Sequence, residues 1–300
     1  MPLAFISALR QPYRHHARFE GVLGTALELQ VLGASRQAAQ KAEAQALAEI
    51  ERLEAVYSRF LPDSELNRWQ QGQLAEVSPD LAWLLLEAER WMERTGGAFN
   101  PAVDAVQNLH RRNPDPDEAE LEPIHTALQA PLWGWENGRP VRLTALSLNF
   151  NSFAKGHIAD RAAAAALRIE GVRGVMVNLG GDLCHQGENA LEVSVAHPFS
   201  RADNAPTIAR LRVRDRGVAT SGHTQRGRHL FDPRTARPVG RVAQATVVAE
   251  NAAAADVLAT ALCVLEPEEG QALAERCGAD ALIVDADGRQ WGSQGLKRLR

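Results

Sequence analysis

The sequence is poor in cysteine and has no long apolar stretch. Cys184, Cys263 and Cys277 lie far apart, without a C-x-x-C pair, so neither a disulfide framework nor a cysteine-rich zinc site is expected. The longest apolar runs, such as VLATALCVL, are well below the roughly 20 residues that span a bilayer. The opening residues MPLAFISALRQPYRHH lack the basic region and small-residue cleavage site of a signal peptide. These absences predict a cytoplasmic protein without a transmembrane segment.

The sequence also lacks a block of like charges. Lys and Arg number 33 against 37 Asp and Glu, and the formal net charge is -4. Clusters of basic residues are limited to short Arg pairs and the C-terminal LKRLR. This balance argues against nucleic acid or an anionic membrane as the main partner. No repeat of 20 to 50 residues is visible either, which excludes a solenoid.

What is present is the composition of an ordinary globular protein of 300 residues, with 45% hydrophobic and 23% charged residues. The alternation in TALELQVLG predicts a strand. Helical spacing predicts helices over residues 37–57 and 79–95, whereas residues 111–123, rich in proline and acid, are expected to form a loop.

The second half of the chain alternates strand and helix patterns. Apolar alternation predicts the strands, and Ala-rich runs predict the helices. The dipeptide Asp-Gly predicts the turn of a closing hairpin. The predicted strands are residues 139–150, 174–183, 191–197, 207–220 and 242–250, and the predicted helices are 159–167, 249–267 and 267–276. We therefore expect one α+β domain over residues 1–300, with a mixed or antiparallel sheet and residues 1–20 as a flexible extension.

Two glycine-containing stretches carry polar residues that a plain core does not need. NSFAKGHIAD (Asn151–Asp160) is expected to be a small-residue turn before a helix, where Lys155 would suit a phosphate. The alternative is a capped helix with a surface lysine. NLGGDL (178–183) predicts either a tight turn or a backbone pressed against a ligand.

Two further stretches carry candidate catalytic and metal-binding groups. Residues 218–238 gather Thr220, Ser221, His229 and several arginines, which favours an anion-binding, acid–base loop, although DPRT is also good turn chemistry. In AENAAAADVLATAL, Asp256 and Thr260 lie one helical turn apart. Such hard oxygen ligands suit Mg²⁺ or Ca²⁺ rather than zinc. In the alternative, Asp256 faces solvent and Thr260 bonds back along its helix.

In this order, the stretches resemble motifs of the ApbE family, the FAD:protein FMN transferases. LGT (23–25) resembles M-G-T, and YSRFLPDSELNRW resembles S-x-[FWY]-x-x-x-S-E-L. GGAFNPAV is similar to G-G-x-F-D-P-x-V, and NFNSFAKGHIAD to D-x-G-G-I-A-K-G-x-x-x-D. NLGGDL, VATSG, HLFDPRT and AADVLATAL complete the series. The matches cover most of the chain.

The resemblance implies an α+β fold related to the tunnelling-fold group, FAD as substrate and Mg²⁺ as cofactor. It implies transfer of FMN to a Thr or Ser hydroxyl of an acceptor flavoprotein, with release of AMP. His229 would be the general base. The implied metal ligands are Asp256, Thr260 and the backbone carbonyl of Ser152. The implied FAD-binding residues are Leu23, Phe60, Ala98, Phe99, Asn100, Asn149, Lys155 and Leu230.

The sequence departs from the family pattern at four of these positions. Leu23 replaces Met, Asn100 and Asn149 replace acids, and Ser152 replaces Gly or Ala. The signal peptide and lipid-attachment cysteine of exported members are also missing. Because Lys155, His229 and the Asp256–Thr260 pair are kept, we expect an active transferase. The alternatives are an FAD pyrophosphatase, in which water replaces the acceptor hydroxyl, and a non-catalytic flavin-binding protein.

Overall fold

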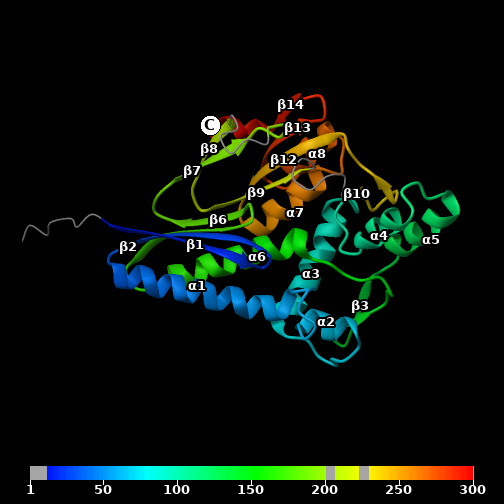
Figure 1. Cartoon of the computed structure of the whole chain (residues 1–300), viewed down its shortest axis with the longest axis horizontal. Helices are drawn as coiled ribbons and strands as arrows, with labels where there is room; N and C mark the ends of the chain where they lie inside the picture. The colour runs from blue at the N-terminus through cyan, green and yellow to red at the C-terminus, as the bar shows by residue number, and fades with distance from the viewer. Residues whose placement is uncertain (1–11, 201–206, 223–229, 300) are drawn as a thin grey trace, which may run out of the picture.

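The fold is organised around an antiparallel sheet of eight strands (Figure 1). The computed structural model describes residues 12–200, 207–222 and 230–299. In spatial order the strands are β1 (Tyr13–Val22), β2 (Thr25–Gly33), β5 (Val172–Leu179), β6 (Asp182–Gly187), β9 (Arg216–Gly222), β12 (Val242–Ala249), β13 (Asp280–Asp285) and β14 (Gln290–Gly292). Separate hairpins are β3 (Trp133–Glu136) with β4 (Arg139–Arg142), β7 (Leu191–Ala196) with β8 (Thr207–Val213), and β10 (Phe231–Asp232) with β11 (Arg237–Pro238).

Helices cover one face of the sheet, and the β7–β8 hairpin covers the other (Figure 1). The helices are α1 (Arg36–Tyr57), α2 (Glu65–Gln70), α3 (Pro79–Arg94), α4 (Asp104–Arg112), α5 (Glu118–Gln129), α6 (Asn151–Leu167), α7 (Ala252–Leu262) and α8 (Pro267–Arg276), with a 3₁₀ helix at Gln294–Arg298. This architecture confirms the predicted α+β class. None of the described helices is long and apolar enough to cross a membrane.

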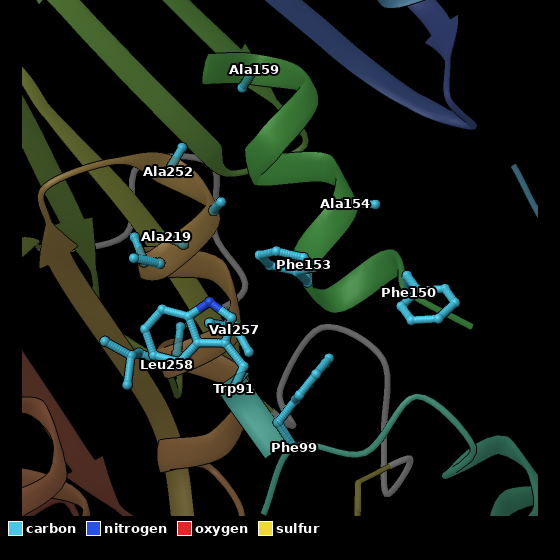
Figure 2. Packing of buried hydrophobic residues seen from close by; sticks show 14 of the residues in the cluster. Trp91, Phe99, Phe150, Phe153, Ala154, Ala159, Ala219, Ala252, Val257 and Leu258 are labelled. Carbon is cyan, nitrogen blue, oxygen red and sulfur yellow. The ribbon is translucent and has the colours of Figure 1, made fainter. Parts of the chain in front are cut away.

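The strand alternation divides the buried side chains into two cores. On β12, Ala245 and Val247 pack with the helices, whereas Val248 packs against the β7–β8 side. This is the period of two that a strand imposes on its side chains. The larger core holds the buried residues of α1, α6 and α7, and Figure 2 shows its part between α6 and α7. Helices α6 and α7, which carry the candidate residues Lys155, Asp256 and Thr260, therefore lie on the helical face of the sheet.

The structure corrects several expectations from the sequence. The predicted strands 174–183 and 207–220 each contain the turn between two strands. Residues 111–123 are not all loop, because Asp117 and Glu120 form a capping box that starts α5. Of residues 139–150, only Arg139–Arg142 form a strand. Residues 13–20, expected in a flexible extension, belong to β1. Helix α6 begins at Asn151 rather than near 159, so Lys155 lies inside the helix and not in a turn before it.

Helix α6 also buries a histidine that titrates far from its usual range. The His157 ring stacks on Trp83 with ring centroids 3.8 Å apart, and its Nε2 has no hydrogen-bond partner among the described residues. Burial lowers the pKa of His157 to about 3, so the side chain is neutral at pH 7.

We expect His157 to make the folded state sensitive to acid. Its pKa is about 3 in the folded protein, against about 6.5 when unfolded, so the unfolded chain binds the extra proton between these values. Stability is therefore lost as the pH falls from about 6.5 towards 3, by up to about 1.4 kcal/mol per pH unit. Urea unfolding at several pH values should show a weaker loss in His157→Phe, which keeps a ring against Trp83. The control His125→Gln, at a half-buried histidine on α5, should follow the wild type. An unchanged slope in His157→Phe would contradict the assignment.

Candidate functional site

The first turn of α6 departs from regular helix geometry at Ser152. Its φ and ψ are -81° and 16°, which places a kink inside the helix. In an unbroken helix the N–H of Gly156 would bond to the Ser152 carbonyl; here it donates to Asp256 Oδ2 over 3.3 Å. This contact places a carboxylate of α7 beside α6, one turn after the kink at Ser152.

Helices α6 and α7 run antiparallel and lie in direct contact (Figure 2). A Cβ on Gly156 would lie 2.3 Å from the Ala252 carbonyl oxygen, so only glycine permits this approach. One turn further along α6, Asp160 accepts hydrogen bonds from the N–H groups of Ala252 and Ala253, at 2.8 and 2.9 Å. Burial raises the pKa of Asp160, while these two backbone donors oppose the rise.

Helix α7 presents the predicted metal ligands. Asn251 caps its N-terminus by accepting from the N–H of Ala254. Asp256 is only 3% exposed, which excludes the alternative in which it faces solvent. Thr260 Oγ1 lies 3.3 Å from Ser221 Oγ at the end of β9, rather than bonding only within its own helix. Asp256 and Thr260 remain on one stripe of the helix, as predicted.

The donor chemistry of this stripe fits a hard divalent cation. A buried carboxylate, a threonine hydroxyl and a backbone carbonyl are all oxygen donors, and Mg²⁺ needs few protein ligands because water and phosphate complete its shell. Among the described residues no group of three or more His, Cys, Asp or Glu could hold a metal, so a zinc-type site is not found there. Ser152, Asp256 and Thr260 therefore stay the candidate ligands.

Lys155 is held by an acid that follows a glycine turn. Its Nζ forms an ion pair with Asp182, a buried residue at the start of β6. Asp182 directly follows Gly180 and Gly181, both at positive φ, so NLGGDL is the tight turn that joins β5 to β6. Lys155 is therefore not the surface lysine of the alternative interpretation.

The turn containing Leu23 lies against this glycine turn. Leu23 and Gly24, with φ of 51° and 73°, form the two-residue connection between β1 and β2. A Cβ on Gly180 would lie 2.3 Å from Thr25 Oγ1, so the two hairpin ends are in contact. Leu23 is half-buried near the strand end that supplies Asp182.

Asn149 joins the start of α6 to a charged pair. Its Oδ1 accepts from the N–H of Asn151, and its Nδ2 donates to Asp104 Oδ2 over 3.0 Å. Asp104 also forms an ion pair with Arg59, whose guanidinium lies over the Phe60 ring at 4.6 Å. Phe60 is 68% exposed, which leaves its ring free to contact a flat ligand.

The turn after α3 is buried more deeply than a pocket lining would be. Ala98, Phe99 and Asn100 are 2–5% exposed. The Phe99 ring lies edge-on to Phe153 of α6, with centroids 6.3 Å apart. Asn100 donates to the Leu128 carbonyl, a bond that the family's aspartate could not make, and accepts from the N–H of Ala102. Their role in binding FAD stays a prediction.

The DPRT segment lies beside the turn after α3 and beside α4. Arg234 binds Asp232 through Nε and Nη2, each 2.9 Å from one carboxylate oxygen, and this ion pair raises the pKa of Arg234. Leu230 is half-buried, and its carbonyl accepts from the N–H of Val239. The predicted base His229 lies outside the described residues.

Fold and site together define an α+β protein in which two antiparallel helices in contact carry a stripe of oxygen donors and a lysine that is paired with a buried acid of the sheet. A crystal structure of the ApbE protein from Thermotoga maritima superposes with a TM-score of 0.83 at 23% identity, over 96% of this chain and 99% of that one. This likeness confirms the fold. A family model described as the ApbE family matches residues 23–283, and the chain belongs to that family.

Two relatives are similar in sequence, and both are named FAD:protein FMN transferase. The protein from Rhodobacter capsulatus is 29% identical over 290 residues, covering 89% of this chain. This chain spans 54% of that relative's length. The protein from Vibrio cholerae serotype O1 is 30% identical over 253 residues, covering 76% of this chain and 74% of its own length.

Sequence reasoning missed three acids that organise this region. Asp182 holds Lys155, Asp104 holds Asn149, and Asp160 holds the start of α7. Asp182 and Asp160 lay in the motifs already singled out, but their partners are 27 and 92 residues away in sequence. Only the fold shows these contacts.

Proposed function

We propose that the chain transfers the FMN half of FAD to a Thr or Ser hydroxyl of an acceptor flavoprotein, with AMP as the leaving group. The observation that carries this proposal is the contact of α6 with α7, which gathers the kink at Ser152, the buried Asp256 and the ion-paired Lys155. The names of the two relatives support the same activity.

In this reaction the acceptor oxygen attacks the phosphorus of the FMN half. The bond between that phosphorus and the bridging oxygen breaks, and the electron pair leaves with AMP. Catalysis of such phosphoryl transfer is mainly positioning and neutralisation of charge. Lys155 would hold a phosphate oxygen, and Asp182 keeps its ammonium group in place beforehand. His229 would take the proton of the acceptor hydroxyl.

Mg²⁺ would be held by Asp256, Thr260 and the Ser152 carbonyl, where it supplies neutralisation of phosphate charge. The exposed Phe60 ring and the half-buried Leu23 would contact the flavin or adenine. Asn149 would act on FAD through the first turn of α6, which it holds by accepting from the N–H of Asn151. The cytoplasmic location inferred from the sequence stays a prediction.

The first experiment incubates the protein with FAD, Mg²⁺ and a flavoprotein acceptor domain, followed by a denaturing gel viewed under ultraviolet light. We expect a fluorescent acceptor band that disappears with EDTA. A dark gel with AMP in solution would indicate a pyrophosphatase instead. A stable yellow complex without AMP would indicate a flavin-binding protein.

The His229→Ala variant tests the proton transfer in the same assay. Removing a general base typically costs at least about 100-fold in rate. We expect the initial rate of acceptor labelling to fall by that order while FAD binding, followed by flavin fluorescence, is kept. Equal labelling by variant and wild type would exclude His229 as the base.

A further inference from the structure

Asp160 is half-buried against the helix that carries Asp256, although it is not among the candidate ligands. We propose that Asp160 is a positioning residue, which clamps the first turn of α7 onto α6 and so sets the position of Asp256 in the site. The inference rests on the proposed function, because it assigns Asp256 to the metal site.

The clamp consists of one carboxylate with both oxygens in use. Oδ1 accepts from the N–H of Ala252 at 2.8 Å, and Oδ2 accepts from the N–H of Ala253 at 2.9 Å. The first four N–H groups of a helix have no partner within it. Asn251 accepts only from the N–H of Ala254, so Asp160 supplies the partners that Ala252 and Ala253 lack within α7 and at the same time attaches α7 to α6.

The clamp lies one helical turn from the candidate ligand. Ala252 and Asp256 are four residues apart on α7, and Gly156 and Asp160 are four residues apart on α6. Because Gly156 has no Cβ, the backbone of Ala252 can lie against it. The N–H of the same glycine donates to Asp256. A helix moves as a rigid body over one turn of about 5.4 Å. A shift of the Ala252 end therefore displaces the Asp256 carboxylate relative to Ser152 and Lys155.

Strand β6 contacts the side chains of both Asp160 and Lys155. The Cys184 thiol, buried on β6, interacts with the Asp160 side chain and opposes the rise in its pKa that burial causes, while burial and the nearby carboxylate raise the pKa of the thiol. Cys184 lies two residues after Asp182, so both side chains point to the same face of the strand. One strand thus fixes Lys155 through Asp182 and the start of α7 through Asp160. This arrangement explains how a lysine and a carboxylate from separate helices keep a constant spacing.

The test measures metal binding directly, without turnover. Mn²⁺ serves as the probe for the hard-cation site, and its dissociation constant is measured by electron paramagnetic resonance on the full chain. In Asp160→Asn the amide NH₂ must face a backbone N–H, which loosens the clamp. We expect the dissociation constant to rise about 10-fold, the effect typical of losing a group that orients a metal ligand.

The matched control is Ser35→Ala, which removes the N-cap contact of α1 with Ala38, far from α7 in sequence and fold. It should lose stability by a comparable amount yet bind Mn²⁺ like the wild type. If Asp160→Asn also bound Mn²⁺ like the wild type, the clamp would be excluded. If the wild type bound no Mn²⁺, the proposed metal site itself would fail, independently of Asp160.

A second variant covers the case in which Asp160→Asn does not fold. Asp160→Glu keeps both acceptor oxygens but lengthens the side chain by one methylene, which pushes the start of α7 away from α6. We expect a folded protein with weaker Mn²⁺ binding. Wild-type affinity in Asp160→Glu would overturn the proposal.

Discussion

Asp256→Asn is expected to lower the rate of FMN transfer by about 1000-fold, the upper range for removing one preorganised electrostatic group from an active site. The amide keeps an oxygen that can accept from the N–H of Gly156, so the contact between α6 and α7 survives. What is lost is the negative charge that would hold Mg²⁺. The measurement is the initial rate of AMP release and acceptor labelling at saturating FAD, over a series of Mg²⁺ concentrations.

The control for this variant is another buried aspartate. Asp285 on β13 is fully buried, and its Oδ1 accepts from the N–H groups of Asp287 and Arg289. Asp285→Asn makes the same chemical change and keeps an acceptor oxygen, but on the C-terminal hairpin. We expect its transfer rate to match the wild type. A loss of similar size in both variants would show a general effect of neutralising buried acids rather than a metal ligand.

Gly156→Ala is expected to destabilise the protein by about 3 kcal/mol and to abolish transfer together with metal binding. The new Cβ would lie 2.3 Å from the carbonyl oxygen of Ala252 and 2.8 Å from the Ala253 Cα, and both are backbone atoms that cannot move aside alone. Overpacking of this kind costs about 1–3 kcal/mol or more, even though alanine favours a helix over glycine by about 1 kcal/mol. Urea unfolding gives the stability change.

Gly270→Ala provides the comparison within another helix. Its Cβ would meet only side-chain carbons of Ile283 and Leu262, at 3.2 Å, and these can shift by a few tenths of an ångström. We expect a change between neutral and a gain of about 1 kcal/mol, from helix propensity. If Gly156→Ala were as stable as Gly270→Ala, the close contact of α6 with α7 would be wrong.

The same glycine explains why the sequence misplaced the start of α6. Glycine and serine in NSFAKGHIAD are typical of a turn, and a glycine inside a helix is unfavourable by itself. Helical structure is nevertheless formed because Gly156 allows α7 to approach, and burial of both helices outweighs local propensity. Where the pattern was long and periodic, as in α1 and β12, the prediction was confirmed.

The candidate site was predictable only in part, for a related reason. The spacing of Asp256 and Thr260 fixed their common stripe, because helix geometry alone determines it. The partners of a side chain depend on the fold. Lys155 of α6 forms an ion pair with Asp182 of β6, and the side-chain amide of Asn100 donates to the Leu128 carbonyl. No local pattern indicates such contacts, so the roles of these residues could not be read from the motifs.

The smaller core, between the sheet and the β7–β8 hairpin, has a consequence for local unfolding. The β7–β8 hairpin and the 3₁₀ helix bury few side chains, such as Leu211, Val213 and Leu296, against the side of the sheet opposite to α6 and α7. Units with few buried apolar contacts open at lower free energy than the rest of a protein. Amide hydrogens of this layer should therefore exchange with solvent while those of α6 and α7 stay protected. We therefore expect the layer that carries the candidate ligands to keep its geometry while the opposite layer opens and closes.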